Sequence, residues 1–388
     1  MISLYRNFKL LSGGRERLGD IWLEGGKIVG PRERFDEVID GTGKEYLCPG
    51  FIDIHVHGGG GYGFMSGDPK AVVCAAEYHL RHGATSLFPT VSSAPFEKME
   101  EALKAIGIAK DNGECGANII GAHIEGPYFS VEQCGAQSCD YFTAPIERDY
   151  KCLTERYGSL IRRWDYAPER DEGYRFTEFL VKNGILASCG HSNAVYEEVY
   201  GAYVRGCRHV THLYSGTSTI VRKQGFRYPG VVESAYALED MKIELIADGK
   251  HLPPELLKLA GRMKREGDVC LVSDALECAG AADGSRVIAD GAERIVEDGV
   301  VKMLDRSAFA GSVASTDTLV KTAVCAGISL PLAVKYVTEN PAALFGLNKG
   351  LLEEGYDADV VILDEELSVK TVIVGGKQMK KRENERRI

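Results

Sequence analysis

The sequence lacks any long hydrophobic run. No uninterrupted apolar stretch approaches the roughly 18 residues of a membrane-spanning helix, so we expect no membrane partner. The segment MISLYRNFKLLSGG has no long apolar region of the kind that a secretory signal contains. Together these two absences predict a cytoplasmic protein.

A recognisable disulfide or zinc framework is also missing. The eleven cysteines are an odd number and are scattered along the chain. Cys134 and Cys139 are separated by four residues and have no matching second pair, unlike the cysteines of the usual structural zinc sites. We therefore expect reduced thiols, which fits a cytoplasmic location.

Positive charge is not in excess. The chain has 46 Lys and Arg against 56 Asp and Glu, which gives a formal charge of −10. A nucleic-acid partner would need a basic face, so we expect none, whereas an anionic small molecule needs only a local cluster of positive groups. With 44% apolar residues among 388 and no repeats, the chain can form one large barrel domain with additions or two ordinary domains.

Both ends of the chain carry short runs typical of β-strands. Residues 20–29 (DIWLEGGKIV) fit two strands around a Glu-Gly-Gly turn. Residues 358–363 and 370–374 are rich in β-branched side chains, and a Gly-Gly turn follows them. We therefore expect the two ends to build one small β unit together.

Between the ends, short apolar runs alternate with segments of helical pattern such as 69–83 and 197–206. This alternation, repeated eight times, predicts a (β/α)8 barrel, and the number of strands favours it over a doubly wound open sheet. The eight expected strands are residues 51–57, 85–91, 118–126, 160–169, 184–192, 207–214, 241–249 and 269–275.

Most of these runs end in a residue that can bind a metal. The carboxyl ends of barrel strands point to one mouth, so these side chains are expected to meet there. The first pair is separated by one residue and therefore faces the same side of its strand, and four glycines follow it. The six residues are His55, His57, Glu125, His191, His212 and Asp274.

Other histidines and one cysteine are expected to have different places. His123, two residues before Glu125, should share its face one layer deeper and support the site. His209 should face away, toward the helices, whereas His79 and His82 lie in a helical stretch and should be at the surface. Cys189 should pack in the core.

A mixed imidazole and carboxylate set suits zinc, iron, manganese or nickel, whereas calcium and magnesium prefer oxygen ligands. A catalytic metal ion lowers the pKa of a bound water molecule toward neutrality. The carboxylate of Asp274 could then take a proton from that water and return it to a leaving group. These residues therefore predict a metal-dependent hydrolase.

Seven stretches in this order resemble the amidohydrolase superfamily and, within it, the N-acetylglucosamine-6-phosphate deacetylase family: PGFIDIHVHG, GAHIEGPY, GHSNA, THLY, ADGKH, LVSDA and AGS. The resemblance covers about residues 20 to 375. It implies an α/β fold with a TIM-like barrel over residues 51–344 and a small β-sandwich domain built from residues 1–50 and 345–388. It also implies hydrolysis of N-acetylglucosamine 6-phosphate to glucosamine 6-phosphate and acetate.

The resemblance implies roles for individual residues. Glu125, His191 and His212 would hold a primary metal ion, and His55 and His57 would hold a second one with Glu125 as the bridge. Zinc or iron is the expected metal, with one or two ions per subunit. Asp274 corresponds to the catalytic aspartate.

For the substrate, Arg227 and His251 match residues at the sugar phosphate, and arginine suits a phosphate because of its planar, permanently charged donors. The family is commonly dimeric, so we expect a homodimer. Whether a phosphate ligand comes from the neighbouring subunit is left open.

Two departures from the family pattern leave alternatives open. Many members have His-Leu-Tyr-Asn-Ala where this chain has HLYSGTS, so Ser215 and Gly216 stand at the phosphate-contacting places. Gln137 stands where some members carry a histidine thought to polarise the acetamide carbonyl. Our hypothesis is that a second metal ion at His55 and His57 compensates for the missing charge.

The alternatives are a deacetylase of another acetamido sugar phosphate, such as N-acetylgalactosamine 6-phosphate, a cyclic-amide hydrolase and a non-enzymatic sugar-phosphate sensor. The cyclic-amide hydrolases of the dihydroorotase type usually carry a modified lysine at the end of strand four, and residues 160–169 contain no lysine. A sensor would not need Asp274.

Overall fold

The computed structural model describes residues 1–113, 115–289 and 292–379. Within these residues, eight parallel strands form a nearly closed barrel in the order in which the chain presents them. They are β6 (Phe51–Val56), β9 (Ala84–Ser92), β11 (Ala122–Glu125), β12 (Ile161–Tyr166), β13 (Leu186–Cys189), β14 (His209–Val210), β17 (Lys242–Ile246) and β18 (Val269–Val272).

Each barrel strand corresponds to one of the eight apolar runs, so the predicted barrel is confirmed. The first and last strands, β6 and β18, meet through their carboxyl-terminal extensions. The backbone N–H of Asp274 donates to the carbonyl of His55, and that of His57 donates to the carbonyl of Ala275. A short strand, β10 (Asn118–Ile119), extends the ladder of β9.

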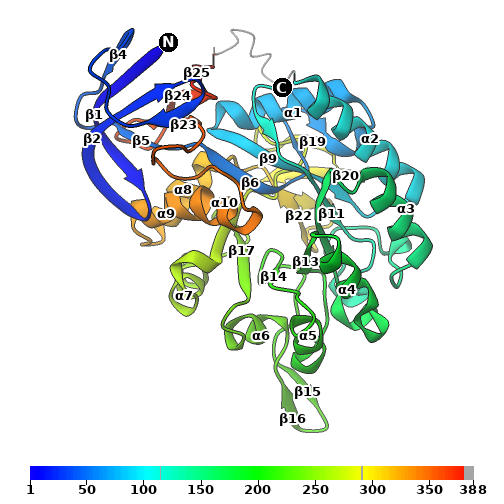
Figure 1. Ribbon diagram of the computed structural model, residues 1–388. Helices are drawn as coiled ribbons and strands as arrows, with labels where there is room; N and C mark the ends of the chain where they lie inside the picture. The colour runs from blue at the N-terminus through cyan, green and yellow to red at the C-terminus, as the bar shows by residue number, and fades with distance from the viewer. Residues whose placement is uncertain (114, 290–291, 380–388) are drawn as a thin grey trace.

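Helices surround the barrel (Figure 1). In the first of them, the Asp68 side chain accepts from the backbone N–H of Lys70, and Pro69 occupies the first helical position, so the helix starts there. Its buried residues recur at helical spacing and face the strands. The helices are α1 (Pro69–Arg81), α2 (Phe96–Asn112), α3 (Glu147–Tyr157), α4 (Arg175–Lys182), α5 (Tyr196–Tyr203), α6 (Val231–Ala237), α7 (Pro254–Met263), α8 (Thr316–Cys325), α9 (Leu330–Val337) and α10 (Glu339–Phe345). Among the described residues, no helix combines the length and the apolar character needed to cross a membrane.

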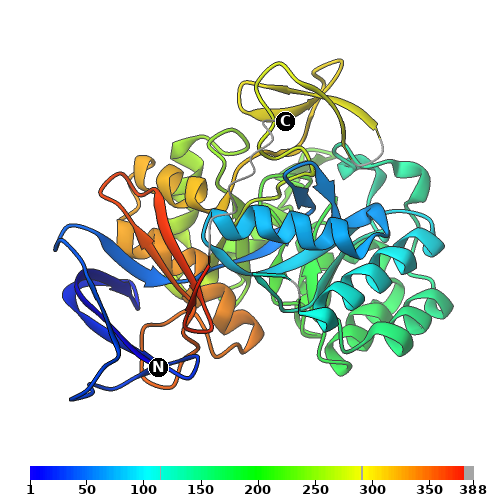
Figure 2. The same cartoon turned by 90° about the horizontal axis from the view of Figure 1, so that it is seen from above.

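Strands from both ends of the chain form one hydrogen-bonded sheet with its own apolar cluster, in agreement with the small β unit expected from the termini (Figures 1 and 2). Its strands are β1 (Ile2–Ser12), β2 (Arg15–Glu24), β3 (Lys27–Val29), β4 (Glu37–Asp40), β5 (Tyr46–Pro49), β23 (Val360–Leu363), β24 (Val369–Val374) and β25 (Lys377–Gln378). Gly50 alone joins β5 to β6, and a Cβ there would lie 2.1 Å from Oγ1 of Thr85 on β9, so the close packing of this junction against β9 requires glycine. The domain boundaries at 50 and 345 stay predictions.

Three small antiparallel elements were not predicted. A four-stranded antiparallel sheet lies between β18 and α8 and covers one side of the barrel mouth (Figure 2). It consists of β19 (Arg286–Ala289), β20 (Ala292–Glu297), β21 (Val300–Met303) and β22 (Phe309–Ser312). A hairpin of β15 (Val221–Lys223) and β16 (Phe226–Tyr228) projects away from the barrel, and β7 (Gly58–Gly59) pairs with β8 (Tyr62–Gly63).

The interior of the barrel is polar. Arg163 is fully buried and donates to both Asp165 and Glu244, at 2.7 Å and 2.6 Å for the shortest contact to each. Buried charges are tolerated when they are paired and hydrogen-bonded in this way. His123 joins the same layer, with Nε2 2.8 Å from Asp165 Oδ2, which agrees with the expected supporting place below Glu125.

Two placements predicted from the sequence are wrong. His209 is inside the barrel, with Nδ1 2.7 Å from Ser188 Oγ. Strand β14 ends at Val210, so counting the alternation from His212 back to His209 crosses a turn and gives the wrong face. His79 is also fully buried, because it lies on the face of α1 that packs on β7, and its Nε2 is 2.7 Å from the carbonyl of Gly58. His82, by contrast, keeps about a third of its side chain exposed.

Candidate metal centre and active site

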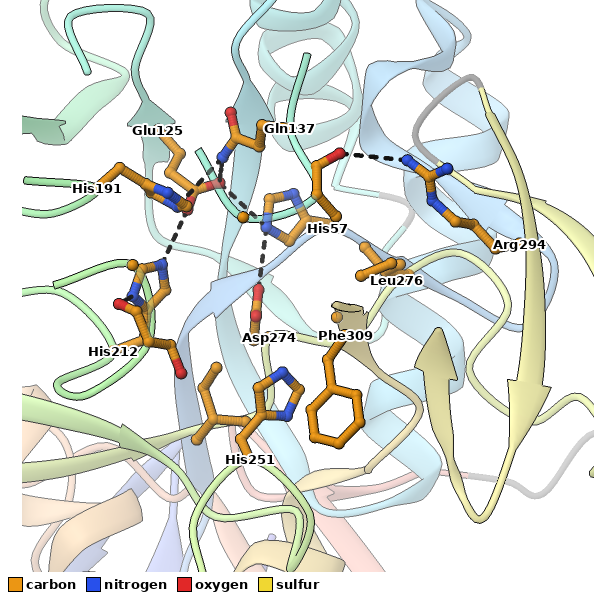
Figure 3. Close-up of a pocket in the computed structure, with 17 residues that line it drawn as sticks. His57, Glu125, Gln137, His191, His212, His251, Asp274, Leu276, Arg294 and Phe309 are labelled. Carbon is orange, nitrogen blue, oxygen red and sulfur yellow. Dashed lines mark hydrogen bonds and ion pairs between the residues drawn. The ribbon is translucent and has the colours of Figure 1, made fainter. Parts of the chain in front are cut away.

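A cavity of about 250 Å³ lies at the carboxyl-terminal ends of the barrel strands (Figure 3). Its floor is formed by residues at the ends of the barrel strands, and the β19–β22 sheet forms part of its wall. The lining residues are His57, Glu125, Gly135, Ala136, Gln137, His191, His212, Ser215, Gly216, Ile246, His251, Asp274, Leu276, Arg294, Phe309, Ala310 and Gly311. The predicted catalytic and metal-binding residues, except the deeper His55, therefore share one cavity.

Glu125 lies at the centre of the histidines. Its Oε1 is 3.1 Å from His191 Nε2, 3.2 Å from His212 Nε2 and 3.6 Å from His55 Nε2. Its other oxygen, Oε2, is 3.4 Å from His57 Nε2. The carboxylate thus contacts histidines of both predicted ligand groups, with Oε1 near His191, His212 and His55 and Oε2 near His57.

Asp274 faces the strand-one pair from the other side. Its Oδ1 is 3.2 Å from His57 Nε2 and 3.5 Å from His55 Nε2 (Figure 3 shows the first contact). His55, His57 and Asp274 form one group of donor atoms within 4.8 Å of one another, and His55, Glu125 and His212 form another. A third group contains His55, His123 and Asp165, so His55 belongs to all three groups found among the described residues.

Each of these histidines uses Nδ1 to contact the protein. Nδ1 of His191 is 2.7 Å from the carbonyl of Gln133, and Nδ1 of His212 is 3.0 Å from the carbonyl of Ser215. A carbonyl oxygen only accepts, so both Nδ1 atoms carry a proton, and Nε2 is in each case the nitrogen that can bind a metal ion. Fixing the imidazole in this way is the usual arrangement around a bound metal ion.

The strand-one pair is oriented in the same manner. His57 Nδ1 is 3.0 Å from Ser92 Oγ, and His55 Nδ1 is 2.8 Å from Glu244 Oε1. His55 Nε2 is buried and has no hydrogen-bond partner among the described residues. A buried polar atom of this kind needs a partner, and a divalent cation would supply one. The residues present therefore fit the metal that the sequence predicts.

Burial and charge act in opposite directions on the carboxylates. Burial alone would raise the pKa of Glu125, but the neighbouring histidines, His55 first, hold that pKa well below its usual range. Asp274 behaves in the same way, since the hydrogen bond from His57 lowers its pKa against the effect of burial. For His57, burial acts to lower the pKa, but the contact with Asp274 outweighs it and raises the value. A bound cation would take the place of protons in this cluster.

The backbone is bent at three of the site residues. His191, His212 and Asp274 each follow the end of a barrel strand by two residues. Each has a positive φ, of 43°, 25° and 48° respectively. Left-handed φ values are uncommon for residues other than glycine, and they occur preferentially at functional sites.

Gln137 enters the cavity from the loop that follows β11. Its Nε2 donates to Glu125 Oε2 at 2.8 Å and lies 3.5 Å from His191 Nε2, while its Oε1 is buried and has no hydrogen-bond partner in the described part of the chain. The side chain therefore lies against the carboxylate at the centre of the site.

The structure brings three of the four predicted substrate-binding residues to the cavity: His251, Ser215 and Gly216. His251 Nδ1 is 2.7 Å from Asp248 Oδ2. Burial acts to lower the pKa of His251, but Asp248 outweighs it and raises that pKa above 6.5. Arg227 lies on β16 in the exposed hairpin and does not line the cavity of its own chain, so its role stays a prediction.

Several site residues were missed in the sequence. Arg294 and Phe309 line the cavity from the β19–β22 sheet, and Arg294 Nη2 donates to the carbonyl of Ala136 at 3.2 Å. Nothing in the local pattern marks Arg294, whereas Phe309 directly precedes the AGS motif. Glu244, below the cavity, could have been found as a carboxylate within an apolar strand.

Comparisons with known proteins agree with this geometry. Residues 46–379 match the model of the amidohydrolase family. The N-acetylglucosamine-6-phosphate deacetylase of Lysinibacillus sphaericus is 30% identical over 381 residues, covering 96% of this chain and 97% of that protein. The N-acetylgalactosamine-6-phosphate deacetylase of Escherichia coli O157:H7 is 30% identical over 335 residues, covering 86% and 87%. The solved structure of the N-acetylglucosamine-6-phosphate deacetylase of Thermotoga maritima is 31% identical, with a TM-score of 0.84 and coverage of 97% and 99%.

Proposed function

The chain belongs to the amidohydrolase family, and from that premise we propose that it hydrolyses N-acetylglucosamine 6-phosphate to glucosamine 6-phosphate and acetate. One observation carries the proposal. A single cavity contains the metal ligands around Glu125, the carboxylate of Asp274 and the candidate phosphate-binding residues His251, Ser215 and Gly216. Relatives named for this reaction match over nearly the full length of the chain.

A divalent cation at this site would lower the pKa of a water molecule and polarise the acetamide carbonyl. Asp274 would accept a proton from the attacking water and transfer it to the nitrogen as the C–N bond breaks. Water thus supplies the oxygen of acetate, and its protons complete the amine. Gln137, whose Nε2 donates to Glu125, would use its other N–H to donate to the oxyanion that forms at the carbonyl.

We assign two ions to the centre, zinc or iron. Glu125, His191 and His212 would hold the first, and His55 and His57 the second, with Glu125 between them. Three contacts of Glu125 support this count: its Oε1 faces His191 and His212, and its Oε2 faces His57. A second ion would also supply the positive charge that Gln137 lacks.

A homodimer is part of the proposal. The β15–β16 hairpin projects from the barrel (Figure 1). Phe226 on the hairpin is 70% exposed, and Ile220, which precedes it, is 56% exposed. Arg227 on the same hairpin lies outside the cavity of its own chain, so its proposed phosphate contact is to the cavity of a second copy. The cytoplasmic location stays a prediction from the sequence.

The alternative substrate is N-acetylgalactosamine 6-phosphate. The observation that favours it is the HLYSGTS sequence, which places Ser215 and Gly216 in the cavity wall. The relative named for that substrate is also 30% identical. Identity alone therefore does not separate the two epimers.

The test is acetate release by the metal-replete protein from both epimers and from unphosphorylated N-acetylglucosamine. We expect the highest kcat/KM with N-acetylglucosamine 6-phosphate and a large loss without the phosphate. A higher value for the galactosamine epimer would establish the alternative, and no acetate release from any of the three would overturn the proposal.

A further inference from the structure

We propose that Glu244 is a positioning residue that holds His55 in its metal-binding orientation and so sets the affinity of the second metal ion. Glu244 lies on β17, is fully buried below the cavity and does not line it. The inference rests on the metal centre proposed above, and metal binding can test it independently of deacetylation.

The carboxylate of Glu244 is surrounded by donors. Oε1 accepts from His55 Nδ1 at 2.8 Å, from the backbone N–H of His212 at 3.1 Å and from Arg163 Nη2 at 2.9 Å. Oε2 accepts from Arg163 Nη1 at 2.6 Å. One side chain is therefore bonded to a ligand of each proposed ion.

The contact to His55 determines which ring nitrogen carries the proton. A carboxylate only accepts, so Nδ1 carries a proton and Nε2 is the nitrogen that can bind a metal ion. That Nε2 lies 3.6 Å from Glu125 Oε1 and 3.5 Å from Asp274 Oδ1, which is the side on which the ion would bind. Glu244 thus orients the imidazole so that its Nε2 faces the site of the ion.

His55 differs from the other three candidate histidine ligands in the group that its Nδ1 contacts, which is a carboxylate. The Nδ1 atoms of His191 and His212 face carbonyl oxygens, and that of His57 faces the hydroxyl of Ser92. A charged carboxylate partner raises the basicity of the imidazole more than a neutral oxygen does. His55 should therefore be the strongest ligand of the second ion, and its strength should depend on Glu244.

Arg163 keeps Glu244 ionised and fixed. Its two terminal nitrogens both bond to the Glu244 carboxylate, and its Nε donates to Asp165. The contact of Glu244 with the His212 backbone holds the turn at which φ is 25°. All four contacts of the carboxylate come from donors, so a glutamine at this position would direct its NH2 group against one of them.

The experiment is a Zn²⁺ titration of the metal-stripped, full-length chain, comparing the wild type with Glu244→Gln. We expect two ions in the wild type. In the variant, the affinity for the second should fall about 10- to 100-fold, and that for the first less than about threefold. Co²⁺ spectra provide a second readout, because only the band of the second ion should change.

Asp171→Asn is the matched control. Asp171 is also a buried carboxylate, but it accepts from the backbone N–H groups of Phe176 and Thr177 at the start of α4. It should leave both affinities unchanged. If Glu244→Gln does not fold, Glu244→Asp keeps the charge beside Arg163, shortens the side chain by one methylene and should weaken the same ion.

The proposal is overturned if the wild type binds only one ion, or if a folded Glu244 variant binds both ions as the wild type does. It is also overturned if both affinities fall together in Glu244→Gln and in Asp171→Asn. Selective loss of the second ion without deacetylation by the wild type would support the proposal while refuting the proposed function.

Discussion

Glu125 Oε1 and His191 Nε2 lie 3.1 Å apart, although 66 positions separate the two residues in the chain. The contact exists because β11 and β13 end at the same mouth of the barrel. It places a carboxylate and an imidazole at the distance at which they can share a cation. We expect the reactivity of the site to follow from this convergence. Four predictions concern the chemistry of the site, and a fifth concerns the stability of the fold.

Asp274→Asn should fold and bind metal but lose nearly all turnover. Asparagine keeps the shape of the side chain but cannot take a proton from water, and general acid–base catalysis contributes about 10² to 10⁴ in rate. Steady-state kcat gives the result, with the metal content and the melting temperature as controls. A kcat within tenfold of the wild type would contradict the assigned role.

Removal of the metal should abolish activity reversibly. The Nε2 atoms of the four ligand histidines converge on carboxylate oxygens that only a cation or protons can balance. A chelator should therefore eliminate acetate release, and stoichiometric Zn²⁺ or Fe²⁺ should restore it. Full activity in a protein shown by elemental analysis to be free of metal would refute a metal-dependent mechanism.

The KM for the phosphorylated substrate should rise with pH. Burial acts to lower the pKa of His251, but Asp248 raises it above 6.5, so the folded protein favours the charged form. The positive charge of His251, which attracts the substrate phosphate, predominates below about pH 6.5. It is lost as pH increases through the raised pKa.

The measurement for His251 is KM against pH at saturating metal, with unphosphorylated substrate as the comparison. In Asp248→Asn the rise of KM should move to lower pH, because the pKa of His251 loses its main support. An identical pH profile in the variant would show that His251 does not respond to Asp248.

Arg294→Gln should raise KM more than it lowers kcat. The guanidinium lines the cavity from β20, and a hydrogen bond from a charged donor is worth about 10- to 100-fold in binding. Arg286→Gln is the control, since Arg286 lies in the same sheet but is 70% exposed and pairs with Glu293. Equal kinetics for the two variants would exclude contact between Arg294 and substrate.

His79 should make the fold sensitive to acid. Burial lowers the pKa of His79 to about 4, whereas in the unfolded chain the value is near 6.5. The unfolded chain therefore binds the proton first, and stability is lost as pH falls from about 6.5 toward 4.

Denaturant unfolding across this pH range tests the His79 prediction. In His79→Gln, the slope of the free energy of unfolding against pH should decrease by up to about 1.4 kcal/mol per pH unit. Glutamine can still donate to the carbonyl of Gly58. An unchanged slope would show that His79 does not titrate on unfolding.

The sequence by itself determined the barrel and the composition of its metal site. The eight apolar runs match eight strands, because burial on both faces of a parallel strand produces a local pattern that composition reveals. His55, His57, Glu125, His191, His212 and Asp274 could be expected to meet because the ends of such strands share one mouth.

Only the tertiary structure decided which surfaces cover that mouth and which charges lie beneath it. Arg294 reaches the cavity because an antiparallel sheet between β18 and α8 packs over it, and no local pattern states where an insertion folds. His79 and His209 were placed wrongly because their burial depends on polar partners from distant segments, Gly58 and Ser188. Glu244 acquires its role only when β17 lies beside β14, which brings Arg163, His55 and His212 around one carboxylate.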